Sequence, residues 1–200
     1  MNRKEKIDFF FAPPLPVQPG PQVSVLYLAR REAQECLVGD VYRENVVLTV
    51  PGGHHRLFAT TMVIVAALDL LAKFHAGKDD QGGVGERFKT FVETFLLPSD
   101  GDSKLFAEVL YLGCRNPLLH SFGLHNKKHN VLLIGNADNS IVIQRDRNEP
   151  TRFLVSVEGL FTQFIAAIWA YEAEVRKSSV LQENLERMFD DYGVLTIGQL

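Results

Sequence analysis

The run LFATTMVIVAALDLL at residues 57–71 decides the fold, because it is apolar on nearly every side of a helix. Helix-compatible residues extend it from His54 and His55 to about His75. A helix that is hydrophobic all round is buried at the centre of its domain, so other helices must surround it. Asp69 interrupts the run, which is shorter than the ~20 residues needed to cross a bilayer. We therefore expect a core helix, not a membrane span.

Composition places the chain among globular proteins with a single domain. Its 200 residues are 46% hydrophobic, which is ample for a sizeable core. The formal net charge of −3 argues against a broad basic face that coats nucleic acid, although it allows a locally basic groove. Cys36 and Cys114 lie far apart without CxxC spacing, and the first apolar run meets Pro13 too early for a signal peptide. Both features favour a reduced, cytoplasmic protein.

Residues 1–22 are predicted to be a proline-rich N-terminal extension, and residues 23–200 a single helical domain. Proline lacks an N–H and restricts the residue before it, so we expect no helix in the extension. An extended strap is expected instead, with Phe9–Phe11 packed against the body or against a partner chain. The prolines concerned are Pro13, Pro14, Pro16, Pro19 and Pro21.

The remaining helices are predicted from apolar residues that recur every three or four positions. The last one runs from about Val157 to Asp191, and the pair Ser178-Ser179 either breaks it or lies exposed on it. A β-branched run at residues 46–50 indicates a brief extended piece before Pro51. The other predicted helices cover residues 24–43, 86–97 and 103–120, the last with Ser103 as its N-cap.

Two short β-prone runs interrupt the helical pattern. Residues 130–134 and 140–144 are joined by Gly135-Asn136-Ala137-Asp138-Asn139, whose residues favour a turn. We therefore predict a hairpin insertion at about residues 130–145. The fold class is mainly α: an antiparallel helical bundle with one small β-hairpin.

The segment Arg115-Asn116-Pro117-Leu118-Leu119-His120 places polar chemistry at the end of an apolar helix. Charged or titrating groups among apolar residues need a partner or have a function. On an ideal helix Asn116 and His120 share a face, whereas Arg115 and His120 are roughly 140° apart. Pro117 removes a hydrogen bond and presses on the carbonyl of Gly113, whose missing side chain leaves room for a kink. With Gly123 as the helix end, this kink would let Arg115 reach His120.

This segment resembles the RX4–6H motif of the HEPN superfamily, with four residues between Arg115 and His120 and a polar residue, Asn116, after the arginine. The order of predicted elements over residues 24–175 is similar to the architecture of that family. The resemblance implies a HEPN-like helical bundle and a metal-independent endoribonuclease of the toxin or antiphage and stress-defence type.

The resemblance also implies residue roles and partners. Arg115 would bind the scissile phosphate, and His120 would move a proton at the ribose 2′-hydroxyl or the leaving oxygen. Asn116 would orient the imidazole or the phosphate. No cofactor or metal is implied. Family members pair across a composite cleft, so a homodimer through the motif helix is expected, with RNA and an antitoxin as further partners and no membrane.

A non-catalytic interpretation of the same residues is also open. Arg115 would then cap carbonyls or pair with a carboxylate, and His120 would close the helix end, in a HEPN-like binding or scaffold domain for a nucleotide or protein partner. After the motif, Lys127, Lys128 and His129 form either a basic edge that contacts RNA or a solvated loop. His125 and His129 are spaced four apart, but with His120 they lack further ligands, so we predict no metal site.

Overall fold

The structure is a computed structural model that describes residues 1–12, 22–38, 57–96, 102–121, 124, 128–134, 143–149 and 152–196. The predicted extended piece at 46–50, the connection at 135–139 and Gly123 lie outside the described residues. The helices are α1 (Arg3–Phe10), α2 (Val25–Val38), α3 (Leu57–Ala76), α4 (Val84–Phe95), α5 (Ser103–Glu108), the π-helix η1 (Val109–Arg115), α6 (Asn116–Ser121), α7 (Val157–Lys177) and α8 (Ser179–Tyr192). The strands are β1 (Gln22–Ser24), β2 (Asn130–Ile134), β3 (Ile143–Arg145), β4 (Arg152–Ser156) and β5 (Val194–Thr196).

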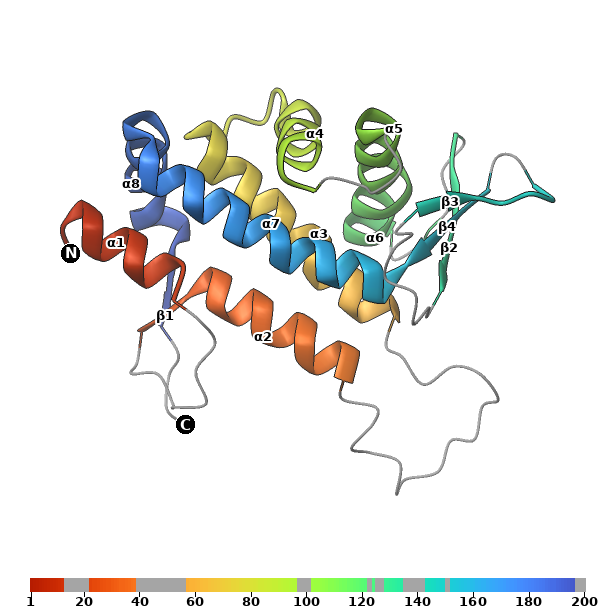
Figure 1. The fold of residues 1–200 in the computed structure, drawn as a ribbon, viewed down its shortest axis with the longest axis horizontal. Coiled ribbons are helices and arrows are strands. Elements are labelled where there is room, and N and C mark those ends of the chain that lie inside the picture. The colour runs from red at the N-terminus through yellow and green to blue at the C-terminus, as the bar shows by residue number, and fades with distance from the viewer. Residues whose placement is uncertain are drawn as a thin grey trace, which may run out of the picture.

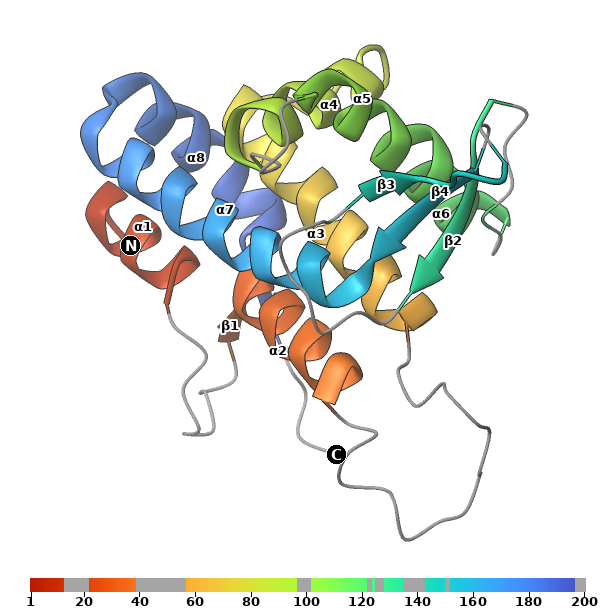
Figure 2. The same cartoon turned by 45° about the vertical axis from the view of Figure 1, so that its right-hand side comes forward.

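The bundle is built around α3, as its all-round apolar sequence predicts. Helices α2, α4, α7 and α8 all pack against it, and η1 does so as well. The three-stranded sheet lies at one end of the bundle and α1 with α8 at the other (Figures 1 and 2). By length and composition α3 could also span a membrane, but a buried core helix of this kind meets the same criterion. The mainly α fold with a small β-hairpin is confirmed.

The prediction of an extended N-terminal strap is wrong for residues 3–10, which form α1. The prolines begin only at Pro13, and Asn2 and Glu5 form a capping box that satisfies the first N–H groups of the helix. Phe10 and Phe11 are buried in the core of the same chain. This N-terminal helix is therefore part of the domain and packs in cis.

The predicted hairpin is correct in kind but wrong in its pairing. β2 does not pair with β3: both flank β4, in the order β2-β4-β3. β3 and β4 form the antiparallel pair, whereas β2 runs parallel to β4 with Val131 opposite Phe153. β4 escaped prediction because Ser156, its last residue, is also the N-cap of α7, so no turn separates strand from helix. A second pair, β1 with β5, joins the two ends of the chain.

Helix ends follow local capping chemistry. The helix that contains the motif is capped by Asp102, whose carboxylate accepts from the N–H of Leu105, rather than by the predicted Ser103. Ser178 breaks the last predicted helix in two, since it ends α7 and its hydroxyl accepts from the N–H of Leu181 in α8. α2 is described only to Val38, so its predicted end near residue 43 lies outside the described residues.

Candidate active site at the motif helix

The motif lies where a π-helix passes into an α-helix. In η1 the hydrogen-bond register shifts by one residue, and the N–H of Asn116 donates to the carbonyl of Tyr111, five residues earlier. Pro117 follows at once and has no N–H to donate. The distortion expected around Pro117 is thus the short π-helical segment η1, which we also call the π-turn. Such segments are frequent at functional sites.

Gly113 has a different role from the one predicted. A Cβ at this position would lie 2.5 Å from Cγ2 of Val131 in β2, much closer than atoms in contact allow. The missing side chain therefore lets the sheet pack directly on η1, and it does not simply leave room for a kink.

The guanidinium of Arg115 joins the predicted motif residues. Its Nη1 donates to Oδ1 of Asn116 at 3.2 Å and lies 3.2 Å from Nε2 of His120. The other terminal nitrogen, Nη2, donates to Oδ2 of Asp69 at 3.0 Å. The ring of Tyr111, one turn earlier, lies 5.8 Å from Cζ of Arg115, within reach of a cation–π contact. Arg115, Asn116 and His120 therefore form one cluster, as the sequence predicts.

The contact between Arg115 and His120 defines which imidazole nitrogen carries the proton. A guanidinium can only donate hydrogen bonds, so Nε2 of His120 must accept through its lone pair. The proton of the neutral ring is then on Nδ1. His120 is exposed, whereas only 12% of the Arg115 side chain is exposed. The Nε2 nitrogen of the exposed His120 thus contacts the largely buried guanidinium of Arg115.

Asp69 is the site residue that the sequence analysis missed. It lies on α3, 46 positions before Arg115, and only 16% of its side chain is exposed. A signal was present, because Asp69 is the single acidic residue in α3, which is otherwise almost wholly apolar. A carboxylate in such a position needs a cationic partner. Helix periodicity alone could not say which cation that is.

The predicted basic edge is only partly at the surface. Lys128 is exposed and lies 4.0 Å from Glu108. His129 turns inward: its ring packs edge-on against Phe153, and its Nε2 lies 3.5 Å from Glu108. Lys127 lies outside the described residues, as does His125. Glu108 thus offsets part of the positive charge that was expected here.

Two other kinds of chemistry find no support at this site. Among the described residues, no three His, Cys, Asp or Glu side chains are grouped so as to hold a metal ion. Cys114, next to Arg115, is fully buried, and burial raises the pKa of its thiol to about 12. A thiol of this kind is not a nucleophile at neutral pH.

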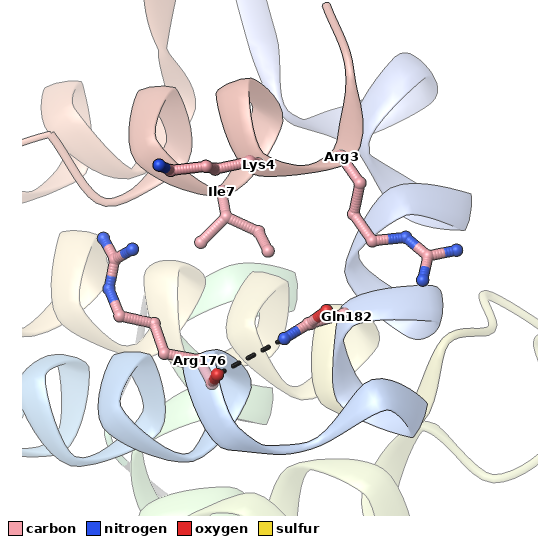
Figure 3. Close-up of a pocket in the computed structure, with 5 residues that line it drawn as sticks. All are labelled: Arg3, Lys4, Ile7, Arg176 and Gln182. Atoms are coloured by element: carbon pink, nitrogen blue, oxygen red, sulfur yellow. Dashed lines mark hydrogen bonds between the residues drawn. The ribbon is translucent and has the colours of Figure 1, made fainter.

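A second collection of cations lies at the other end of the bundle. A groove of about 390 Å³ separates α1 from the junction of α7 and α8, and Figure 3 shows its lining. Arg3 is paired with Glu186 at 2.7 Å, and Arg176 with Asp8 at 2.8 Å and with Glu172 at 2.7 Å. These carboxylates offset the arginines, so the groove is a weaker candidate than the motif cluster. The lining residues are Arg3, Lys4, Ile7, Arg176 and Gln182.

Comparison with protein-family models, with curated proteins and with solved structures found no match to this chain. Any assignment of function must therefore come from the residues and geometry of the site.

Proposed function

We propose that the protein is a HEPN-type, metal-independent endoribonuclease with Arg115 and His120 as its catalytic pair. The observation that carries this proposal is the 3.2 Å contact between Nη1 of Arg115 and Nε2 of His120. This contact supports the proposal because a guanidinium can bind phosphate and an imidazole can accept a proton, and the His120 imidazole is exposed. Cleavage of RNA through its own 2′-hydroxyl uses these two functions together with a proton donor for the leaving oxygen, and it can proceed without a metal.

The reaction follows from the chemistry of the two side chains. The 2′-oxygen attacks the adjacent phosphorus, a 2′,3′-cyclic phosphate forms, and the bond to the 5′-oxygen breaks. The phosphate first replaces Nε2 of His120 as an acceptor for the Arg115 guanidinium, and the freed lone pair of Nε2 then takes the proton from the 2′-hydroxyl. The guanidinium of Arg115 stabilises the negative charge that builds on the phosphate oxygens, because its planar donors match their geometry. Asn116 orients the guanidinium, since its Oδ1 accepts from the same Nη1.

A second copy of the chain completes the reaction. The departing 5′-oxygen needs a proton, and His120 cannot supply one while it is accepting the proton of the 2′-hydroxyl. In a homodimer through the motif helix, the second His120 fills this role at a composite cleft when it is in its protonated, imidazolium form, and it becomes neutral as the 5′-oxygen takes the proton. We place this dimer in the cytoplasm as a toxin or antiphage and stress-defence nuclease, with an antitoxin as a protein partner.

The test is cleavage of mixed RNA by the purified full chain in EDTA. We expect products that end in a 2′,3′-cyclic phosphate and a 5′-hydroxyl. His120→Ala should slow cleavage by ~10²–10⁴-fold, as expected for loss of a general base. Arg115→Ala should slow it by ~10²–10³-fold, as for loss of a charge-stabilising donor.

Arg31→Ala is the matched control for Arg115→Ala. It removes an arginine that pairs with Glu35 on the surface of α2, so cleavage should be unchanged. Equal rates for the unaltered chain and the two site variants, or cleavage of a 2′-deoxy substrate, would contradict the proposal.

One observation favours the alternative of a catalytically silent HEPN-like binding or scaffold domain. Arg115 already donates to Asp69 and Asn116, so the cluster also suits a purely structural helix end. This alternative predicts that His120→Ala lowers the melting temperature while RNA remains intact with every variant.

A further inference from the structure

Asp69 reaches the motif from a different part of the chain. It belongs to the central helix α3, whereas Arg115, Asn116 and His120 follow one another on η1 and α6. Both members of the Asp69–Arg115 pair are largely buried, with 16% and 12% of their side chains exposed. Separating the two groups would leave each of them as an uncompensated charge in a largely buried position. Each group therefore holds the side chain of the other in place.

The pair also fixes the direction of the guanidinium. Because this group is planar and rigid, holding Nη2 determines where Nη1 points. Asp69 holds Nη2 at 3.0 Å, and Nη1 then points to Nε2 of His120 at 3.2 Å. The π-turn at Val109–Arg115 sets the position of the Arg115 backbone but leaves several rotatable bonds in its side chain. Asp69 and Asn116 remove that freedom together, because Asp69 holds Nη2 and Asn116 holds Nη1.

We propose that Asp69 is a positioning residue, which aims Arg115 at His120 and so keeps the imidazole proton on Nδ1 and the lone pair on Nε2. The catalytic consequence rests on the proposed ribonuclease function, whereas the effect on the tautomer does not. Asp69 touches neither substrate nor reacting atoms in this scheme. It acts only through Arg115.

The negative charge of Asp69 has a second effect that separates two variants. In Asp69→Asn an oxygen still accepts from Nη2, but the charge that offsets Arg115 is gone. The RNA phosphate should then be held more tightly. In Asp69→Ala the acceptor itself is gone, so the guanidinium keeps only its bond to Asn116 and can turn Nη1 away from His120.

The test of the positioning role is nitrogen-15 NMR of histidine-labelled full chain, with His120→Ala used to assign the His120 signals. Spectra are taken at pH 8.5, about two units above the ordinary histidine pKa of about 6.5. In the unaltered chain the Nε2 signal should be that of an unprotonated nitrogen. In Asp69→Ala it should shift toward the protonated form, because free imidazole in water favours the proton on Nε2. Asp69→Asn should keep the original pattern.

Kinetics on the same proteins test the catalytic consequence. Asp69→Ala should lower kcat by ~10- to 100-fold, as a misplaced catalytic group does. Asp69→Asn should show a smaller loss of kcat together with a lower KM. If Asp69→Ala does not fold, Asp69→Ser replaces it. The serine hydroxyl is one bond shorter than the carboxylate, so it does not hold Nη2, but it leaves a polar group and room for water beside the buried cation.

The two readouts separate the two proposals. A tautomer that is unchanged in a folded Asp69→Ala or Asp69→Ser variant overturns the positioning role, whatever the cleavage rates are. A shifted tautomer in a protein that cleaves no RNA supports the positioning role and rejects the ribonuclease.

Discussion

Two clusters meet the central helix α3 and have opposite character. On one face Phe74 stacks on Phe10 at 4.3 Å between ring centroids, and His75 lies among aromatic rings that include Tyr171. On another face Asp69 binds Arg115. Asp69 and Phe74 are five positions apart, which is roughly 140° around a helix. A single helix therefore supports an aromatic cluster and a polar motif cluster.

The two clusters differ in how many hydrogen bonds their polar side chains form. In the aromatic cluster the hydroxyl of Tyr171 has no hydrogen-bond partner among the described residues, and burial raises its pKa. In the motif cluster Nη1 and Nη2 of Arg115 donate to three side chains, although its Nε also has no hydrogen-bond partner among the described residues. Apolar burial, which needs no direction, stabilises the first cluster. Directed hydrogen bonds define the second, and such bonds are what chemistry on a substrate requires.

The largest expected effect is on the aromatic cluster. Phe10→Ala should lower the free energy of unfolding by ~3–5 kcal/mol, because Phe10 is fully buried and stacks on Phe74. Denaturant unfolding measures this loss. Phe9→Ala on the same helix is the matched control, and its loss should be smaller because Phe9 is only half-buried. Equal losses for the two would mean that α1 is not anchored through Phe10.

An intermediate effect is expected where the sheet meets the motif helix. Gly113→Ala should cost ~1–3 kcal/mol, because the new methyl group would overlap Val131. Val131→Ala should make Gly113→Ala less harmful, so a double-mutant cycle from unfolding curves should give a favourable coupling. Additive losses would show that the close approach of β2 to η1 is not what requires glycine.

The smallest effect is the pH dependence that the aromatic cluster imposes through His75. Burial lowers the pKa of His75 below its ordinary value of 6.5, so the unfolded chain binds the proton more readily than the folded one. Stability is therefore full above pH 6.5 and is lost as the pH falls toward the lowered pKa. Unfolding curves between pH 8 and 5 should show this fall.

His75→Gln should flatten the fall between pH 8 and 5. The pH dependence that Asp79 contributes provides a contrast with that of His75, because it falls at lower pH. The hydroxyl of Tyr192, with help from Lys73, lowers the pKa of Asp79 below 3.8, so its contribution is lost only in more acidic solution. If the free energy of unfolding falls equally between pH 8 and 5 with and without His75, the effect belongs to another group.

Much of the fold could be predicted because apolar periodicity is a local signal. The helices at 57–76, 84–95 and 103–121 follow from residues three and four positions apart. β4 could not be predicted in this way, because five residues that pass directly into a helix carry no boundary. The N-terminal helix could not be predicted from the prolines, because they begin only at Pro13, whereas the capping box at Asn2 and Glu5 starts the helix ten residues earlier.

The candidate site also combines residues that are near one another in the sequence with residues that only tertiary packing brings together. The sequence by itself determined that Arg115, Asn116 and His120 lie within six positions, and Pro117 predicted the distortion that lets Arg115 reach His120. Only the tertiary structure decided that Asp69 joins them, that Gly113 admits Val131, and that His129 turns toward Phe153. These contacts join residues that the chain order separates by 46, 18 and 24 positions. Side-chain spacing along a helix is local, whereas the partner of a buried charge depends on which elements pack together.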